Sequence, residues 1–468
     1  VQIYESYGYT TREAVESIVR NNLYGLDIDD RAAQLAYFSV MMKARQYDRR
    51  FFSKGIDPHI YAIQESNTIN RNQLKYFGSG LSELEINQAD IQIRSLLDTL
   101  QDAKEYGSIL QIEQYDWELL YRFVFSCDYS GQMEFEAVGL EYTKNKLFEL
   151  VQIGATLAQK YDVVCTNPPY MGSGNMNSKL SEYVKKIYPN GKSDLFACCI
   201  EKGFQMLKPL GYNAMVTMHS WMFLSSLESF RDYILNSKTI CTLLQLDNMV
   251  MGIAFGTVAS VFWNTHFEKY LGGFTKVSLT DLSDGIPSDF PSPTIGLFYK
   301  SIDDFFSIPG HTIAYWISKS ALNAFSYPSL SKYATTRLGM STANNDRFMR
   351  NWFEVSICKI GFGMKTSCEA EQSHKKWFPY NKGGTFRKWY GNNDYIVNWE
   401  NDGFEIKNFK DEKTGRIRSH NYNGEYGFRE SLTWSDISSS HNFGIRYSGA
   451  GKLFDGRAYS KYSFIAWF

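Results

Sequence analysis

The feature that most constrains this chain is an apolar run, residues 161–165, followed after one residue by Asn167-Pro168-Pro169-Tyr170. A short apolar run of this kind is typical of a buried strand. Two consecutive prolines fix the backbone φ angle and have no N–H to donate, so the strand cannot continue through them. The sequence therefore predicts a buried strand that ends in a rigid, polar loop with an aromatic tip. The alternative interpretation is a proline-rich turn in which Tyr170 is an ordinary surface aromatic.

This loop contains the groups needed to methylate an exocyclic or amide nitrogen. Such a nitrogen is a poor nucleophile because its lone pair is delocalised into a ring or a carbonyl. The side-chain oxygen of Asn167 and a backbone carbonyl of the Pro168-Pro169 turn can both accept hydrogen bonds from the NH2 group, which draws the nitrogen toward a tetrahedral geometry. The ring of Tyr170 can stack on the planar group that is modified.

A second informative segment lies near the beginning of the chain. Residues 22–29 predict a short strand with acidic residues at its carboxyl end, and residues 31–45 predict a helix. A strand, an acid and a helix in this order are typical of a doubly wound α/β fold. At this position Asp27 would bind the ribose hydroxyls of a nucleotide-like cofactor, and Ile28 would pack on its adenine.

The acidic residues also have a structural interpretation. Asp29 or Asp30 could cap the amino end of the following helix by accepting hydrogen bonds from free N–H groups. Both interpretations can hold together, with Asp27 as the ligand and Asp30 as the cap.

The rest of the chain divides by its patterns into three parts. Residues 1–270 continue the α/β pattern, with a polar helical insertion at about 53–114 and a final apolar strand at 256–263, expected as an antiparallel edge strand. Residues 271–330 are rich in Ser, Pro, Gly and Asp and predict a linker. Residues 331–468 contain short strand-like runs with turns such as Tyr390-Gly391-Asn392-Asn393, which predict a β-rich domain. Further strands are expected at 212–218 and 240–246, and helices at 82–102, 141–159, 193–207 (capped by Ser193 or Asp194) and 227–236.

Charge is unevenly distributed between these parts. Residues 331–468 contain 21 Lys and Arg against 14 Asp and Glu, a balance of +7, so that the remaining residues carry −8 of the formal total of −1. Aromatic residues are interleaved with the cations. An acidic first part and a basic, aromatic last part are expected when only the last part contacts nucleic acid. The alternatives are ordinary fluctuation of charge and an ordinary β-rich core.

Other features exclude several classes of protein. The seven cysteines form no CxxC pair and no zinc-site spacing, which indicates a reducing cytoplasm and no metal. No apolar run reaches the roughly 18 residues of a membrane span. The chain opens on Val1 inside a helical pattern and ends on the strand-like residues 463–468, so we expect a fragment of a larger protein.

Three of these segments resemble the amino-methyltransferases that use S-adenosylmethionine: residues 22–29, residues 167–170 and residues 193–196. Longer strings resemble one subgroup, the adenine-specific DNA methyltransferases of BREX phage defence known as the PglX family. These strings are NNLYGLDIDDRAAQLAYFSVMMKARQYDRRFF, VVCTNPPYMGSGNM, KSDLFACCIEKGFQMLKPLG and FRESLTWSDISSS.

The resemblance implies a Rossmann-like S-adenosylmethionine methyltransferase fold with a mixed sheet, truncated at its N-terminus. A β-rich target-recognition domain, truncated at its C-terminus, would follow. The family's glycine-rich first cofactor loop has no equivalent here, so part of the cofactor site is expected to be missing. The residues implied to bind cofactor are Asp27, Ile28, Asp102 and Asn167, and those implied around the base are Tyr170, Asp194 and Phe255. Asp102 could equally be a solvated helix-end residue, and Phe255 a core residue.

The function implied is methylation of the N6 amino group of adenine in duplex DNA after base flipping, with other phage-defence proteins as partners. Asn167, Pro168, Pro169 and Tyr170 would be catalytic. Asn344 and Asn345 could recognise adenine edges. The candidate DNA contacts, for which a solvated surface is the alternative, are Arg337, Arg347, Arg350, Lys375, Lys376, Arg387, Lys388, Arg416 and Arg418.

Three rival functions remain open. The first is methylation of a glutamine amide in proteins, which uses the same tetrapeptide but needs no basic second domain. The second is a fusion of modification and restriction, whose nuclease would need an Asp…Glu-x-Lys cluster that this sequence does not show. The third is a catalytically silent DNA-binding subunit of a defence complex.

Overall fold

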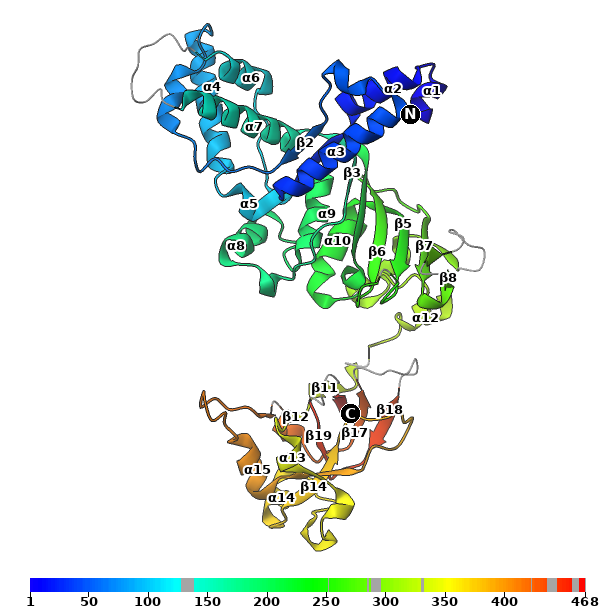
Figure 1. The fold of residues 1–468 in the computed structure, drawn as a ribbon. Coiled ribbons are helices and arrows are strands. Elements are labelled where there is room, and N and C mark those ends of the chain that lie inside the picture. The colour runs from blue at the N-terminus through cyan, green and yellow to red at the C-terminus, as the bar shows by residue number, and fades with distance from the viewer. Residues whose placement is uncertain are drawn as a thin grey trace. The chain divides into compact units, whose positions relative to one another are not determined.

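The computed structural model describes residues 1–127, 139–250, 252–283, 286–287, 296–329, 332–421, 423–435, 444–456 and 463–467. The chain divides into two compact units, Val1–Asn323 and Ala324–Phe468 (Figure 1). Ser331 and Phe468, the ends of the predicted recognition domain, lie outside the described residues, as do residues 436–440 of the last quoted string.

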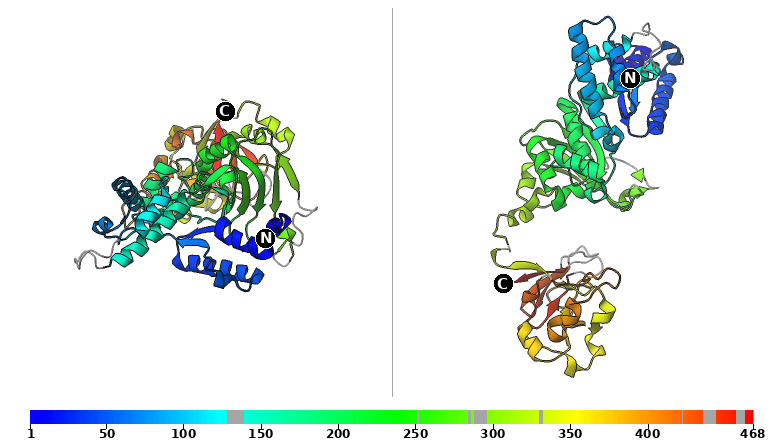
Figure 2. Two further views of the ribbon diagram at one scale, coloured as in Figure 1. Left: turned by 90° about the horizontal axis from the view of Figure 1, so that it is seen from above. Right: turned by 90° about the vertical axis from the view of Figure 1, so that its left-hand side faces the viewer.

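A six-stranded mixed sheet forms the centre of the first unit, in the order β10-β7-β5-β6-β4-β3. Strands β3 and β4 are parallel, whereas β6 is antiparallel to both of its neighbours, β4 and β5. Figure 2 shows the strands of this sheet, drawn in green, from two further directions. The bounds are Tyr161–Thr166 (β3), Leu207–Met218 (β4), Thr239–Leu246 (β5), Thr257–Trp263 (β6), Gly272–Val277 (β7) and Leu297–Lys300 (β10).

The antiparallel direction of β6 agrees with the sequence, but its place does not. It lies inside the sheet, between β4 and β5, and not at an edge. Val258 and Phe262, on one face of β6, are fully buried in the core, whereas Ala259, Val261 and Trp263 on the other face are partly buried.

The segment expected as a linker also differs from the structure. Strands β7 and β10 lie within residues 271–330 and extend the six-stranded sheet. Phe274 and Val277 of β7 are buried, and the boundary between the compact units falls after Asn323. The strands are short and separated by Ser- and Pro-rich residues, so their apolar pattern is weak in the sequence.

Two helices and the sheet share one hydrophobic core. Helix α9 (Leu195–Gln205) packs against β4, and α10 (Glu228–Ser237) packs against β5. Their buried residues Phe204 and Ile234 belong to the same cluster as Phe262 of β6.

A second, two-stranded parallel sheet pairs β1 (Tyr24–Asp27) with β2 (His59–Ala62), and α3 (Asp30–Tyr47) packs against both strands. The predicted order of strand, acid and helix is therefore present. Strand β2 lies in the stretch that was expected to be helical, which corrects the start of the insertion. Its alternating apolar residues are too few to outweigh the polar composition around them.

The helical insertion begins later than expected and extends further along the chain. Three helices, α4 (Glu83–Thr99), α6 (Trp117–Phe125) and α7 (Leu140–Ala158), pack on one another around a second core. Ser82 caps α4 with Glu85 in a reciprocal capping box. The remaining helices of this unit are α1 (Gln2–Ser6), α2 (Thr11–Ser17), α5 (Ala103–Tyr106), α8 (Ser178–Ile187), α11 (Asp303–Phe306) and α12 (Lys319–Ala324, whose last residue belongs to the second unit), with the short pair β8 (Leu282–Ser283) and β9 (Ile286–Pro287).

The second unit contains two four-stranded sheets, and one core cluster of this unit includes Phe348, Phe378 and Trp399. The first sheet has the order β11 (Thr335–Leu338), β20 (Ser463–Trp467), β17 (Ser431–Ser435), β18 (Ile445–Ser448). The second has the order β13 (Met349–Asn351), β15 (Tyr395–Asn398), β14 (Trp377–Asn381), β19 (Leu453–Phe454). A short pair, β12 (Met340–Ser341) and β16 (His420–Asn421), and helices α13 (Asn345–Phe348), α14 (Ser367–Gln372) and α15 (Glu400–Lys407) complete the described elements.

Within the described ranges, no helix is both long and apolar enough to cross a membrane. The same residues contain no cluster of three or more His, Cys, Asp or Glu side chains that could hold a metal ion.

Candidate active site

The Asn-Pro-Pro-Tyr loop follows β3 directly, as the sequence predicts. The prediction that this strand is buried is wrong: β3 is the last strand of the six-stranded sheet, and Val163 keeps 56% of its surface exposed. The hydroxyl of Tyr170 lies 2.9 Å from Oδ1 of Asn167 and 3.2 Å from the backbone oxygen of Val216 in β4, so it can donate to either. Pro168 is buried, whereas Asn167 is exposed. The tyrosine hydroxyl thus lies between the exposed amide and the neighbouring strand.

Hydrogen bonds join the residues after this loop to the start of α9. The backbone N–H of Met171 donates to Oδ1 of Asp194 at 3.1 Å, and the N–H of Leu195 donates to the oxygen of Met171 at 3.0 Å. Ser173 N–H donates to the oxygen of Ser193 at 3.0 Å. Asp194, and not Ser193, is the N-cap of the helix, since its side chain accepts from the N–H of Phe196. Burial raises the pKa of Asp194.

Two aromatic rings meet Tyr170 edge to face. Its centroid lies 5.7 Å from that of Phe255 and 6.3 Å from that of Phe196. Phe196 is fully buried, but Phe255 keeps 37% of its surface exposed. The structure therefore brings Asn167, Tyr170, Asp194 and Phe255 together, with Phe255 at the surface of the group.

The cofactor residues expected from the sequence lie at the carboxyl end of β1. Oδ1 of Asp27 accepts a hydrogen bond from the N–H of Asp29 at 2.9 Å. The N-cap of α3 is Asp29, which accepts from the N–H of Arg31, and not Asp30 as expected. Asp30 instead pairs with Lys104 at 2.7 Å.

The end of β2 lies beside the end of β1, a neighbour that the sequence did not predict. The N–H of Ile63, the residue after β2, donates to the backbone oxygen of Asp27 at 2.8 Å. Glu65 follows and accepts from the N–H of Lys104 at 3.2 Å. The apolar run 59–63 before polar residues was the available signal. Ile28, 48% exposed, lies beside Gly107, where a Cβ atom would come within 3.4 Å of its Cδ1.

Asp102 is held by two partners. Its carboxylate accepts from Nδ2 of Asn67 at 2.7 Å and from Nζ of Lys179 at 2.8 Å. The ion pair and the amide hold the pKa of Asp102 below its usual value, with Lys179 as the largest cause. These contacts connect the start of α5 to α8 and to the residues after β2. Contact between Asp102 and a cofactor stays a prediction.

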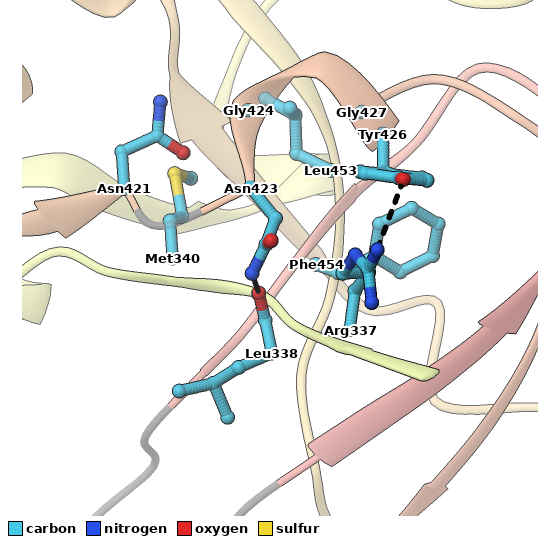
Figure 3. A pocket seen from close by; sticks show the side chains of 11 residues that line it. Arg337, Leu338, Met340, Asn421, Asn423, Gly424, Tyr426, Gly427, Leu453 and Phe454 are labelled. Atoms are coloured by element: carbon cyan, nitrogen blue, oxygen red, sulfur yellow. Dashed lines mark hydrogen bonds between the residues drawn. The ribbon is translucent and has the colours of Figure 1, made fainter. Parts of the chain in front are cut away.

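The candidate DNA contacts of the second unit divide by their partners. Arg347 pairs with Glu405 and Lys376 pairs with Glu400. Arg337 donates to the hydroxyl of Tyr426 and lies 5.0 Å from its ring, in a pocket where Asn423 donates to the oxygen of Leu338 (Figure 3). Arg350 and Lys375 donate to backbone carbonyls, and Arg418 lies over the ring of Phe409.

Three of these cations differ from the rest. In the described part of the chain, the side chains of Arg387, Lys388 and Arg416 form neither an ion pair nor a hydrogen bond. Lys388 lies 5.0 Å from the centroid of Trp389, which is 66% exposed, and the adjacent Tyr390 is 70% exposed. Free cations beside exposed aromatic rings are the combination that single bases and phosphates can contact.

Comparison with known proteins finds similar sequences among methyltransferases. The family model of the Eco57I restriction-modification methylases matches residues 21–250. The adenine-specific methyltransferase PglX of Lacticaseibacillus casei (strain Zhang) is 39% identical over 476 residues, and BrxX of Escherichia coli O9:H4 (strain HS) is 36% identical over 480 residues. Over almost its whole length, the chain is similar to the PglX and BrxX methyltransferases.

These two alignments cover 99% and 97% of this chain but only 39% and 38% of the relatives. The chain thus spans about two fifths of the length of the PglX and BrxX proteins. Among solved structures, the Type IIL restriction-modification enzyme MmeI in complex with DNA covers 99% of this chain, which covers 59% of MmeI, at 11% identity and a TM-score of 0.47.

A buried glutamate in α9 forms hydrogen bonds with residues 190–191, shortly before Asp194. Glu201 is 6% exposed and accepts hydrogen bonds from the N–H of Gly191 and from Nδ2 of Asn190. Burial raises the pKa of Glu201 from 4.5 to about 7. Between these values the folded protein keeps a proton that the unfolded chain has released, so the free energy of unfolding falls as the pH rises through this window.

Glu201→Gln should remove this pH dependence, because glutamine imitates the protonated acid and never ionises. From pH 5 to pH 7 the wild-type protein should lose up to about 3 kcal/mol more stability than the variant. Urea unfolding at both pH values measures the difference. Glu182→Gln, at an exposed position of α8, is the control and should follow the wild type. Equal losses in wild type and Glu201→Gln would contradict the assignment.

Proposed function

We propose that this chain is the catalytic and DNA-recognising part of an enzyme that transfers a methyl group from S-adenosylmethionine to the N6 amino group of adenine in duplex DNA. The observation that carries the proposal is the Asn167–Tyr170 loop at the carboxyl end of β3, with Asn167 held by Tyr170. Similarity to PglX and BrxX over almost the whole chain supports adenine as the target. The setting is phage defence in the bacterial cytoplasm, with other defence proteins as partners.

In the finer description of the fold, the first unit is a Rossmann-like methyltransferase domain and the second a target-recognition domain. Two observations support the first assignment: the mixed sheet, and the position of the two parts of the site. Asp27 and the Asn167–Tyr170 loop both lie at the carboxyl ends of parallel strands. The free Arg387 and Lys388 beside exposed rings support the second.

The residues at the end of β1 fit the proposed cofactor. The carboxylate of Asp27 is an acceptor suited to ribose hydroxyls, and the half-exposed Ile28 offers an apolar surface to adenine. When bound, S-adenosylmethionine supplies an electrophilic methyl group on a positively charged sulfur. Asp102 stays a further candidate for the cofactor's amino group.

The loop residues prepare the nitrogen for methyl transfer. An amide oxygen has two acceptor directions. In Asn167 one direction receives the hydroxyl of Tyr170, which fixes the amide, and the other accepts a proton of the target amino group. The carbonyl of Pro168 accepts the second proton. Tyr170, with Phe255 beside it, stacks against the flipped base, and Asp194 keeps the loop attached to α9.

Asn167→Ala should reduce methylation at least tenfold and leave DNA binding intact, because Asn167 acts on the amino group and not on phosphates. Hydrogen bonds that strengthen in a transition state are worth roughly 2–4 kcal/mol. Methyl transfer to duplex DNA is measured with a gel shift on the same protein. Asn145→Ala, at an exposed position of α7, should behave as wild type. Asn167→Ala activity above about a tenth of wild type would contradict the catalytic role.

Asp27→Ala should weaken binding of the cofactor product more than binding of DNA, since the carboxylate is the proposed ribose ligand. Calorimetry with S-adenosylhomocysteine measures the change. Asp29→Ala is the matched control: it removes the helix cap and should lower stability by about 1 kcal/mol without the same loss of affinity. An unchanged dissociation constant in Asp27→Ala would leave Asp27 a purely structural residue.

Replacing Arg387 and Lys388 together by Ala should flatten the salt dependence of DNA binding. Each phosphate contact contributes about −0.9 to the slope of log K against log salt, so two contacts should reduce its magnitude by about 1.8. Binding is titrated by fluorescence anisotropy at several salt concentrations. Lys376→Ala, whose partner is Glu400, should leave the slope almost unchanged. An unchanged slope in the double variant would favour a solvated surface.

A further inference from the structure

A chain of buried polar side chains ends beside the catalytic loop. The hydroxyl of Tyr315 lies 2.9 Å from Oε1 of Gln245, and Nε2 of Gln245 lies 3.2 Å from Nδ1 of His219. Tyr315 is 1% exposed and Gln245 is 5% exposed. None of the three has a role in the mechanism above, although buried polar groups are costly unless they are satisfied.

The geometry of this chain determines where each proton lies. Burial raises the pKa of Tyr315, so the phenol keeps its proton. The hydroxyl is closer to Oε1 of Gln245 than to the backbone oxygen of Thr275, which lies at 3.3 Å, so it donates to the amide. The amide then presents its NH2 group to Nδ1 of His219, which must accept. A neutral imidazole with Nδ1 as acceptor carries its proton on Nε2.

The imidazole ring is held in place on three sides. A Cβ atom at Gly256 would lie 2.2 Å from Cε1 of His219, so the ring rests directly on the glycine backbone. The backbone N–H of His219 donates to the backbone oxygen of Gly256 at 3.2 Å, and the imidazole ring meets Phe223 edge to face at 5.7 Å. Gln245 holds the third side.

The same segments also position the catalytic loop. Phe255, next to Gly256, meets the ring of Tyr170. The oxygen of Val216, three residues before His219 on β4, lies within hydrogen-bonding distance of the Tyr170 hydroxyl. His219 and Tyr170 therefore flank one site, and Nε2 of His219 has no hydrogen-bond partner among the described residues.

We infer that His219 donates its Nε2 proton to a ring nitrogen of the base that Asn167 and Tyr170 receive. The inference rests on the proposed function and adds a specificity-determining residue to it. A phosphate oxygen is the other acceptor that DNA offers. The base is the better match because burial lowers the pKa of His219, which favours the neutral ring, and because Lys276, the cation that acts on this ring, is already paired with Asp247 at 2.9 Å.

The first test compares two variants of the purified protein on a duplex that contains its methylation site. His219→Phe keeps the ring against Gly256 but removes the donor, and should lower kcat/KM about 5- to 150-fold, the cost of leaving a buried acceptor unpaired. His219→Gln keeps a donor and should recover most of this loss. Circular dichroism and S-adenosylhomocysteine binding, which should not change, show that both variants are folded.

The second test identifies the acceptor. Adenine at the target position is replaced in turn by 1-deaza-, 3-deaza- and 7-deazaadenine, each of which lacks one ring nitrogen. For one of these analogues, the wild-type protein should lose as much activity as the change His219→Phe costs on adenine. The His219→Phe variant should be almost as active on that analogue as it is on adenine. Tyr315→Phe, which leaves the Gln245 amide free to turn, should weaken the discrimination against that analogue.

The outcomes separate the two proposals. Wild-type protein that methylates no adenine overturns both. Wild-type activity beside an equally active His219→Phe variant overturns only the role of His219. A third outcome is that, for every analogue, the activity loss caused by His219→Phe multiplies with the loss caused by the analogue. His219 would then act on something other than a ring nitrogen, such as a phosphate, and its proposed role would also be overturned.

Discussion

The hydrogen bonds of Asp194 are the constraint on which the candidate site depends. One carboxylate caps α9 and accepts the N–H of Met171, directly after the Asn-Pro-Pro-Tyr loop. Backbone hydrogen bonds on both sides of this contact join residues 171–173 to residues 193–195. The loop is thus held in position by hydrogen bonds to a helix that packs in the core of the first unit. This matters because a hydrogen bond acts on a reacting group only if its acceptor is already in place.

The sequence predicted the parts of the site that are continuous in the chain. The position of β3 and its proline loop, β1 with its acidic end, and the cap of α9 are local patterns in which propensity and tertiary structure agree. The exposure of β3 was not predicted, because it follows from the strand's place at the edge of the sheet. Strands β2, β7 and β10 were missed because each has only four to six residues, lies among polar neighbours and is stabilised by pairing within a sheet. The polar edge formed by Asp27 and Glu65 depends on such pairing, and its local signal is only the short apolar run 59–63 before polar residues.

Charge in the second unit shows a different limit. The balance of +7 indicates a basic surface but does not distinguish a cation that is free from one that is already paired. In the structure Arg347 and Lys376 face glutamates, and Arg350 and Lys375 face backbone carbonyls. Exposed ion pairs are weak, but each partner cancels much of the field that a phosphate would meet. Partners distant in the sequence therefore decide which cations are available to DNA.

Gly256 shows how a steric requirement can be invisible in the sequence and decisive in the structure. In the sequence it reads as the first residue of an apolar strand. In the structure any side chain there would overlap the ring of His219. The glycine, directly before β6, leaves room for the imidazole that follows β4, and the ring lies within hydrogen-bonding distance of Gln245. This hydrogen bond in turn determines which imidazole nitrogen carries the proton. A missing Cβ atom just before one strand thus sets the hydrogen-bonding character of a side chain just after another.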